Sequence, residues 1–144
     1  MVFDALIIGG GVSGMQCALV LGSAKNKPFA KNKKVGIIMH QRASHLENAL
    51  FNNVLGLKPK TLGKNILSSG KEHLSKIYTH ISQIENEKVV AIKNIDGVYS
   101  IKTSKKIYLS KIVILALNYS KPFTIDGLAK FIIPHKKPIH QKIE

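Results

Sequence analysis

The stretch DALIIGGGVSGMQCALVL, residues 4–21, decides the fold. It contains most of an apolar run, residues 3–8, that stops at glycine, which is typical of a strand buried on both faces of a parallel sheet. After Gly14, the segment MQCALVLGSA has no proline and is rich in good helix formers, so it predicts a helix that ends near residues 22–24. The stretch therefore predicts a strand, a glycine turn and a helix in succession.

A second strand completes this opening unit. Residues 25–34 contain five lysines and show neither helical nor strand periodicity, so they predict a solvated loop. The apolar segment KVGIIM, residues 34–39, then predicts a second buried strand. Two such strands joined through a helix pair in parallel by a right-handed crossover, so the chain opens as an α/β protein.

The middle of the chain predicts a loop followed by a second helix. Residues 40–60 are polar and irregular, and a short helix near residues 44–50 is an alternative to a plain loop there. Thr61 is predicted to cap a helix that runs to about Lys76. The side chains predicted to line its inner face are Leu62, Ile66, Leu67, His73, Leu74 and Ile77.

The period of the apolar residues shortens from residue 79 onward. It predicts a parallel strand at 79–84, an antiparallel meander, and a last buried strand, KIVILAL at 111–117, that returns to the first sheet. Asp96–Gly97 is a hairpin signal inside the meander. The three meander strands are expected near 88–94, 98–103 and 106–109. The predicted fold class is thus α/β: a Rossmann-like fold with a parallel sheet, helices and a three-stranded antiparallel meander.

Length and composition favour one cytoplasmic domain. The chain has 144 residues, and its longest apolar segments are far shorter than the roughly 20 residues of a membrane-spanning helix. The N-terminus has no basic region, so we expect no secretory signal and a cytoplasmic location without membrane attachment. Residues 1–128 are predicted to form the domain, and residues 129–144 an extension or tail.

The formal net charge of +14 has two interpretations. All but one of the 22 basic residues are lysines, a bias that an AT-rich coding composition produces without selection for a basic surface. A polyanion partner is the alternative, since lysine-rich faces attract phosphate backbones. We do not favour a nucleic-acid partner, because the lysines are spread along the chain and arginine, the main side chain of base readout, occurs only at position 42.

The glycines match the G-x-G-x-x-G pattern of dinucleotide-binding turns. Gly9 permits the tight turn, Gly11 lets a pyrophosphate approach the backbone, and Gly14 permits close packing of helix on strand. A glycine turn needed only for packing is the alternative. Because the motif follows a predicted strand, opens a helix and is completed by a second strand, we favour binding of a dinucleotide diphosphate at the helix N-terminus. Ser13 is expected to bind a phosphate or to cap the helix.

Beyond these motifs, the chain resembles the flavin domain of the thioredoxin-reductase-like pyridine nucleotide-disulfide oxidoreductases. The likeness runs to about Leu128 and is carried by the segments already quoted together with NNVLG (52–56), KVVAIKNIDGVYSIKT (88–103) and DGL (126–128). It implies an FAD-binding, Rossmann-like half in which the meander is the family's three-stranded insert. It also implies that the backbone of Val89 lies beside the adenine, and that residues 53–56 lie near the flavin ring.

Two departures from the family's pattern affect the cofactor contacts. The family ends its second strand with an acid that binds the adenosine ribose, whereas this chain has Met39, which cannot accept that hydrogen bond. His40, Gln41 or Arg42 either replaces the contact, in which case a basic group favours the 2′-phosphate of NADP, or is an ordinary loop residue. The family's Ala-Thr-Gly reads Ala-Leu-Asn at residues 116–118, which is bulkier where the cofactor approaches.

The third departure concerns the rest of the family's architecture. The family continues into a nicotinamide domain with a Cys-x-x-Cys pair and then returns to complete the flavin domain, whereas this chain has the single Cys17, which is expected to be a core residue. We therefore expect a truncated, stand-alone flavin domain, and we assign no catalytic residue because no acid pair or nucleophile–base set can be assembled. The six histidines lack metal-ligand spacing, so no metal site is predicted.

Two functions from different classes remain. The first is a protein that binds a dinucleotide, FAD or alternatively NADP, through Gly9, Gly11, Ser13, Gly14, Met39, His40 and Val89, with its own redox turnover left open. The second is a cofactor-free interaction protein or pseudoenzyme that binds a polyanion, a partner or its own copy. A homo-oligomer or a complementing chain is a further way to close an incomplete cofactor cleft.

Overall fold

The computed structural model describes residues 1–40, 46–117 and 125–127. The opening unit consists of β1 (Val2–Ile8), α1 (Val12–Ser23), the short 3-10 helix η1 (Pro28–Ala30) and β2 (Val35–Met39). A small hairpin and a second helix come next as β3 (Leu50–Phe51), β4 (Thr61–Leu62) and α2 (Gly63–Ile77). The last strands are β5 (Ser82–Glu85), β6 (Val89–Ile95), β7 (Val98–Thr103) and β8 (Ile107–Leu115).

Six of these strands form one mixed sheet in the order β5-β2-β1-β8-β7-β6. The strands β5, β2, β1 and β8 are parallel, and Ile7 of β1 pairs with Ile37 of β2 and Ile114 of β8. The strands β7 and β6 continue the sheet in antiparallel sense, joined at the predicted Asp96–Gly97 hairpin. The Rossmann-like α/β fold, the parallel crossover and the antiparallel meander are thus confirmed.

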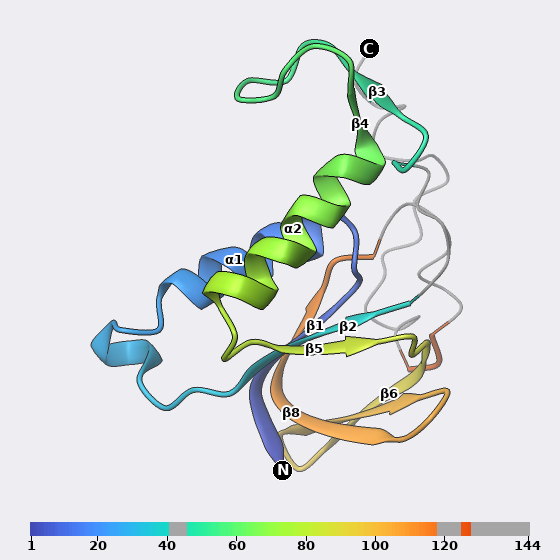
Figure 1. The fold of residues 1–144 in the computed structure, drawn as a ribbon. Helices are drawn as coiled ribbons and strands as arrows, with labels where there is room; N and C mark the ends of the chain where they lie inside the picture. The colour runs from blue at the N-terminus through green and yellow to red at the C-terminus, as the bar shows by residue number, and fades with distance from the viewer. Residues whose placement is uncertain (41–45, 118–124, 128–144) are drawn as a thin grey trace, which may run out of the picture.

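The sheet separates two cores, so the central strands are buried on both faces, as their apolar runs predict. On one face Ile7 and Ile37 pack with Met15 and Ala18 of α1 and with Leu74 of α2. The opposite core is closed by the meander and consists of Phe3, Leu6, Ile8, Ile38, Val89, Ile92, Ile101 and Ile125. Figure 1 shows α1 and α2 on one side of β1, β2 and β5, and β6 with the first part of β8 curving below their other side.

The prediction of separate strands at 106–109 and 111–117 is wrong, because one continuous strand, β8, covers both segments. Residues 107–110 pair with β7 and residues 109–115 pair with β1. Ser110 lies fully buried where the two pairings overlap, and its hydroxyl donates to the Ile112 carbonyl at 2.6 Å. No glycine or proline interrupts the chain here, so a single strand passes from the meander into the parallel sheet.

The second helix differs from its prediction in its start and its inner face. Thr61 belongs to β4 and its hydroxyl donates to the Lys58 carbonyl, so it does not cap α2. Leu74 is 0% exposed, whereas Ile77 is 62% exposed and His73 is also exposed. Gly70 lies so close to Met15 of α1 that a Cβ on it would be 2.5 Å from the methionine sulfur. The face of α2 that contains Gly70 therefore packs against α1.

The two short strands that precede α2, β3 and β4, form a hairpin. Leu50 pairs with Leu62 and Phe51 with Thr61, so the alternative of a short helix near 44–50 is wrong for residues 46–50, while residues 44–45 lie outside the described part. The predicted domain boundary at residue 128 and the tail 129–144 also lie outside the described residues. Within the described residues, neither helix has the length and apolar character that a membrane crossing requires.

Residues 125–127 lie along the edge of β6. The Ile92 amide donates to the Asp126 carbonyl at 2.9 Å, and the Asp126 amide donates to the Val90 carbonyl at 3.0 Å. Gly127 has a φ of +87°, and a Cβ there would overlap the Ile92 carbonyl oxygen. Asp126 and Gly127 therefore continue the edge of the meander by one short parallel bridge.

Asp4 fastens the amino-terminal ends of the central strands. Its carboxylate accepts hydrogen bonds from the Lys111 ammonium group at 2.8 Å and from the Lys34 amide at 2.9 Å, and the ammonium group of Lys33 lies 3.7 Å away. The hydrogen bond from Lys111 is the main cause that lowers the pKa of Asp4 to about 2. One carboxylate thus ties β1 to the start of β2 and to β8.

Asp4→Asn is expected to lower the free energy of unfolding by about 1 kcal/mol at neutral pH, because the ion pairs are partly exposed. The pKa in the folded state lies below the usual 3.8, so this contribution is complete above pH 3.8 and is lost as the pH falls toward 2. Urea unfolding of both proteins across this range tests the prediction. A stability difference that persists unchanged at pH 2 contradicts it.

Candidate functional site

The glycine turn, residues 9–11, lies where the carboxyl ends of β1, β2 and β8 meet. The Gly9 amide donates to the Ile38 carbonyl at 3.0 Å, and the Ala116 amide donates to the Ile8 carbonyl at 2.9 Å. Both neighbouring strands therefore hold the turn in place. The carboxyl end of a parallel sheet is where α/β proteins bind their ligands.

Gly9 and Gly14 are required by the backbone itself. Gly9 has a φ of +124°, a conformation that L side chains rarely adopt, and a Cβ there would overlap the Ala116 carbonyl oxygen. A Cβ on Gly14 would overlap the Gly9 carbonyl oxygen and lie 3.3 Å from the Ala116 Cβ. The steric roles predicted for these two glycines, the tight turn and the close approach of α1 to β1, are confirmed.

Gly11 differs from the other two glycines of the motif. Its φ is −76° and its ψ is −177°, an extended conformation open to any residue. A Cβ at this position would meet no atom of the described residues within 4 Å. Neither the backbone nor packing among the described residues therefore explains glycine here, and a close approach by a ligand stays the predicted reason for it.

The first turn of α1 provides free donors beside Gly11. Gly11 is the N-cap residue, no side chain of the described residues caps the helix, and the first intrahelical bond runs from the Met15 amide to the Gly11 carbonyl at 2.9 Å. The amides of Val12, Ser13 and Gly14 thus have no intrahelical acceptor. The first turn also contains no acidic side chain, so the positive end of the helix dipole is not neutralised locally.

Ser13 lies exposed in this first turn, so it is not the residue that caps α1. The capping alternative is therefore wrong, because the N-cap position is two residues earlier. The predicted contact of the Ser13 hydroxyl with a phosphate is left as its expected role.

Met39 lies at the end of β2, beside the turn, but its side chain points into the helix-side core. It is 5% exposed, and a Cβ placed on Gly10 would lie 2.6 Å from the Met39 Cγ. Its carbonyl accepts from the Glu87 amide at 3.3 Å. The Met39 side chain is therefore part of the core. His40, which follows it, is exposed, and its predicted contact with adenosine stays a prediction. Gln41 and Arg42 lie outside the described residues.

Val89 and Leu117 both pack into the meander-side core. Val89 begins β6, is buried and shares its core cluster with Ile8 and Ile38, so the start of β6 lies beside the ends of β1 and β2. Leu117 packs partly buried against the same cluster. Neither Leu117 nor Met39 fills the space at Gly11. The adenine contact of the Val89 backbone stays a prediction, and Asn118 lies outside the described residues.

Residues 53–56, which the resemblance places near a flavin ring, belong to the loop between β3 and β4. Figure 1 shows this loop projecting from the body of the protein near the N-terminal end of α2. Its side chains are exposed, and the Asn52 side chain at its start accepts from the Lys60 amide at 3.0 Å. The position near a flavin ring stays a prediction.

Sequence reasoning missed Glu87, a buried carboxylate next to the end of β2. It accepts hydrogen bonds from the hydroxyl groups of Thr103 at 2.6 Å and Tyr108 at 2.9 Å. Burial raises its pKa, but these hydrogen bonds and the charges of Lys106 and Lys105 outweigh burial, so the pKa is lowered overall. The pKa of Tyr108 rises to about 12, first through burial and then through Glu87. No sequence signal marks this set, because its members are brought together only by the meander.

Glu87→Leu is expected to lower the free energy of unfolding by about 2 kcal/mol, because the Thr103 and Tyr108 hydroxyls lose a charged acceptor inside the protein. Glu87→Gln keeps an acceptor and is expected to cost less. Glu85→Gln, which changes only the exposed pair with Lys71, serves as the matched control with an effect below about 0.5 kcal/mol. Equal stability of the Glu87→Leu and control variants in urea unfolding contradicts this interpretation.

The described residues offer little for catalysis. Cys17 is half-buried on α1, and burial raises its pKa, which is the opposite of an activated thiolate. Among residues 1–40, 46–117 and 125–127, no group of three histidine, cysteine or acidic side chains is arranged to hold a metal ion. The chemistry that the site supports is the binding of an anion.

No protein-family model matches the chain, and no curated protein matches it. Solved structures do match. An oxidoreductase from Agrobacterium tumefaciens has a TM-score of 0.66 at 22% identity, over 80% of this chain and 36% of that chain. A thioredoxin reductase from Streptococcus pyogenes has a TM-score of 0.63 at 27% identity, over 79% of this chain and 34% of that chain.

A ferredoxin-flavin thioredoxin reductase from Clostridium acetobutylicum has a TM-score of 0.63 at 26% identity, over 85% of this chain and 40% of that chain. The chain therefore has the Rossmann-like fold of thioredoxin reductase-like oxidoreductases over about 80% of its length, and the predicted resemblance is confirmed. It spans between a third and two fifths of the length of these structures.

Proposed function

We propose that the protein binds a dinucleotide, with its diphosphate held by the backbone amides of the glycine turn and the first turn of α1. The observation that carries this proposal is the open space at Gly11 beside the amides of Val12, Ser13 and Gly14, which have no intrahelical acceptors. Oriented backbone donors at the positive end of a helix dipole match the charge and geometry of a diphosphate. The fold shared with thioredoxin reductase-like proteins supports the same assignment.

FAD is the dinucleotide that we favour. A flavin protein shares the fold, since one of the matching structures is a ferredoxin-flavin thioredoxin reductase. The family's pattern has an acid at the end of the second strand, where this chain has Met39. The methionine side chain packs into the core, so no carboxylate is available there to bind the ribose. We therefore propose a modest affinity for FAD, with NADP as the alternative if His40 binds a 2′-phosphate.

Redox turnover is not part of this proposal. The single cysteine is half-buried with a raised pKa, and we assign no catalytic role to a side chain beside the glycine turn. FAD would supply the electron-accepting ring when bound, and this chain would hold its diphosphate. A protein that only binds the cofactor, or that acts with a second chain, is consistent with these residues.

Thermal unfolding with and without nucleotide tests the proposal. A ligand at 100 times its dissociation constant stabilises the folded state by about 2.7 kcal/mol, which raises the melting temperature of a chain of this size by roughly 5–10 °C. We expect this rise with FAD, together with a change in the flavin absorption spectrum when FAD is titrated with the protein. A rise with NADP alone supports the His40 alternative, and no rise with either nucleotide contradicts the proposal.

A further inference from the structure

A separate cavity lies at the opposite end of the sheet from the glycine turn. It has a volume of about 840 Å³ and lies between the connection from α1 to β2 and the amino-terminal parts of β1 and β2. A smaller hollow of about 430 Å³ adjoins it and shares Lys25, Asn26 and Lys31 with it. Both volumes fall within the range of small-molecule sites.

Apolar side chains form much of the wall of the larger cavity. Phe29 and Ile112 both line it although they are 74% and 57% exposed, which leaves large apolar surfaces in contact with water. Leu21, Ala30 and Val35 complete this wall. A ligand with an apolar or aromatic body would remove that surface from water.

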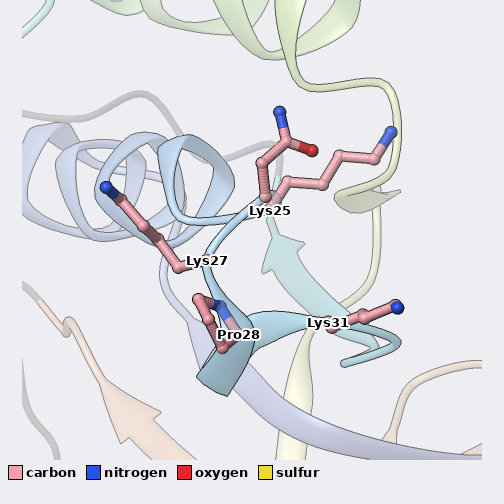
Figure 2. A pocket seen from close by; sticks show the side chains of 5 residues that line it. Lys25, Lys27, Pro28 and Lys31 are labelled. Carbon is pink, nitrogen blue, oxygen red and sulfur yellow. The ribbon is translucent and has the colours of Figure 1, made fainter.

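Lysines surround the same cavity, and their charge is only partly balanced. Lys33 and Lys111 share the carboxylate of Asp4, the only acidic side chain among the described residues of the lining. No carboxylate of the described residues lies within salt-bridge distance of Lys25, Lys31 or Lys34. Figure 2 shows the side chains of Lys25 and Lys31 extending toward the same side of the connection, away from Lys27. The cavity therefore has a surplus of positive charge at its rim.

One buried polar atom also lacks a partner beside this cavity. His80 contributes to the lining, and its Nε2 is buried with no hydrogen-bond partner among the described residues. Burial is the main cause that lowers the pKa of His80, followed by the charge of Lys25, so the ring is neutral at pH 7. Unpartnered buried nitrogens are uncommon in folded proteins, but this atom has almost no accessible surface, so a ligand in the cavity does not depend on it.

From the apolar wall and the unpaired lysines at its rim, we propose that this cavity is a binding site for a small amphipathic organic anion, with an apolar or aromatic body against Phe29 and Ile112 and its anionic head group at Lys25, Lys31 and Lys34. The site is independent of the dinucleotide site, because it lies at the amino-terminal ends of strands whose carboxyl ends hold the glycine turn. An excess of cations with one internally paired acid excludes a cationic ligand.

The probe that tests this is 1-anilinonaphthalene-8-sulfonate, an aromatic monoanion whose fluorescence rises in apolar sites. Titration of the full chain is expected to show one saturable site. The triple variant Lys25→Gln/Lys31→Gln/Lys34→Gln is expected to weaken binding by about tenfold or more, since three charges that attract the head group are removed. Phe29→Gln is expected to weaken binding as well, through the apolar wall.

The matched control is Lys64→Gln/Lys93→Gln/Lys102→Gln, which removes the same charge from exposed positions outside the cavity. It is expected to change the affinity less than about twofold, since distant exposed charges are largely screened. Equal weakening by both triple variants overturns the proposal, because it shows attraction by net charge alone. Probe-induced shifts of backbone amide resonances should gather in residues 24–35, and shifts confined to residues 9–14 overturn the proposal as well.

Addition of ADP separates this site from the proposed dinucleotide site. If both proposals hold, ADP shifts the amide resonances of residues 11–14 at concentrations that leave most of the probe bound, and any displacement of the probe needs higher ADP concentrations, since ADP is itself an aromatic anion. If the chain binds the probe but no nucleotide, the cavity stands and the proposed function fails. Full displacement of the probe by adenosine, which has no charge, overturns the cavity proposal.

Discussion

Gly14→Ala is expected to lower the free energy of unfolding by about 3 kcal/mol, the largest effect of any single substitution considered. The new methyl group would overlap the carbonyl oxygen of Gly9, so α1 must move away from β1. That movement would open the helix-side core, in which Met15 and Ala18 pack against Ile7. Urea unfolding followed by circular dichroism measures the change. A loss below about 1 kcal/mol would show that the contact between α1 and β1 is not tight.

Gly11→Ala is the control for the stability measurement on Gly14→Ala. It is also expected to have a large effect of its own, on the affinity for nucleotide. Its backbone is extended and the space around it is open, so the fold should lose only about 0.5–1 kcal/mol, because alanine is a poorer N-cap residue than glycine. A ligand that approaches the backbone there would meet the methyl group. We therefore expect the affinity for FAD or ADP to fall about tenfold or more, equivalent to about 1.4 kcal/mol, without a matching loss of stability.

The comparison of the two variants separates packing from binding. If glycine is present in the turn only for packing, Gly11→Ala leaves the nucleotide affinity unchanged. If the turn holds a diphosphate, Gly11→Ala reduces binding while the melting temperature stays near that of the original protein. A large fall in stability for Gly11→Ala would contradict the open space observed at this position.

The opening unit could be predicted from the sequence because its signals are local. A buried run followed by glycine and a proline-free helix is a pattern of neighbouring residues. The strands β1 and β2 match their predicted bounds within one residue, and α1 begins at Val12, three residues before the predicted start. Gly9 and Gly14 were predictable for the same reason, since a turn of this kind admits no side chain at either position.

The remaining features depend on contacts between distant segments. One strand covers residues 107–115 because its two halves pair with β7 and β1, and local periodicity contains no information about a shared strand. His73 was predicted on the inner face of α2. Because Gly70 packs against Met15 instead, the side of the helix that contains His73 faces solvent. The buried Glu87 depends on hydroxyl groups that lie 16 and 21 residues away.

Met39 shows the same limit at the candidate site. The sequence identified the missing acid at the end of β2, but not that the methionine packs over Gly10. The methionine packs against the turn and offers no carboxylate for the ribose contact that the resemblance implies. The proposed binding therefore depends on the backbone amides that face the diphosphate and not on a side chain that binds the ribose.

The most direct measurement is a titration of the uniformly ¹⁵N-labelled protein with ADP, and in parallel with adenosine, followed by the backbone amide resonances. If the turn binds a diphosphate, ADP shifts the amides of Gly11, Val12, Ser13 and Gly14, adenosine does not, and Gly11→Ala loses most of the response. If ADP shifts only the lysine-rich segment 25–34, or no amide at all, the claim that these backbone donors receive a diphosphate is wrong.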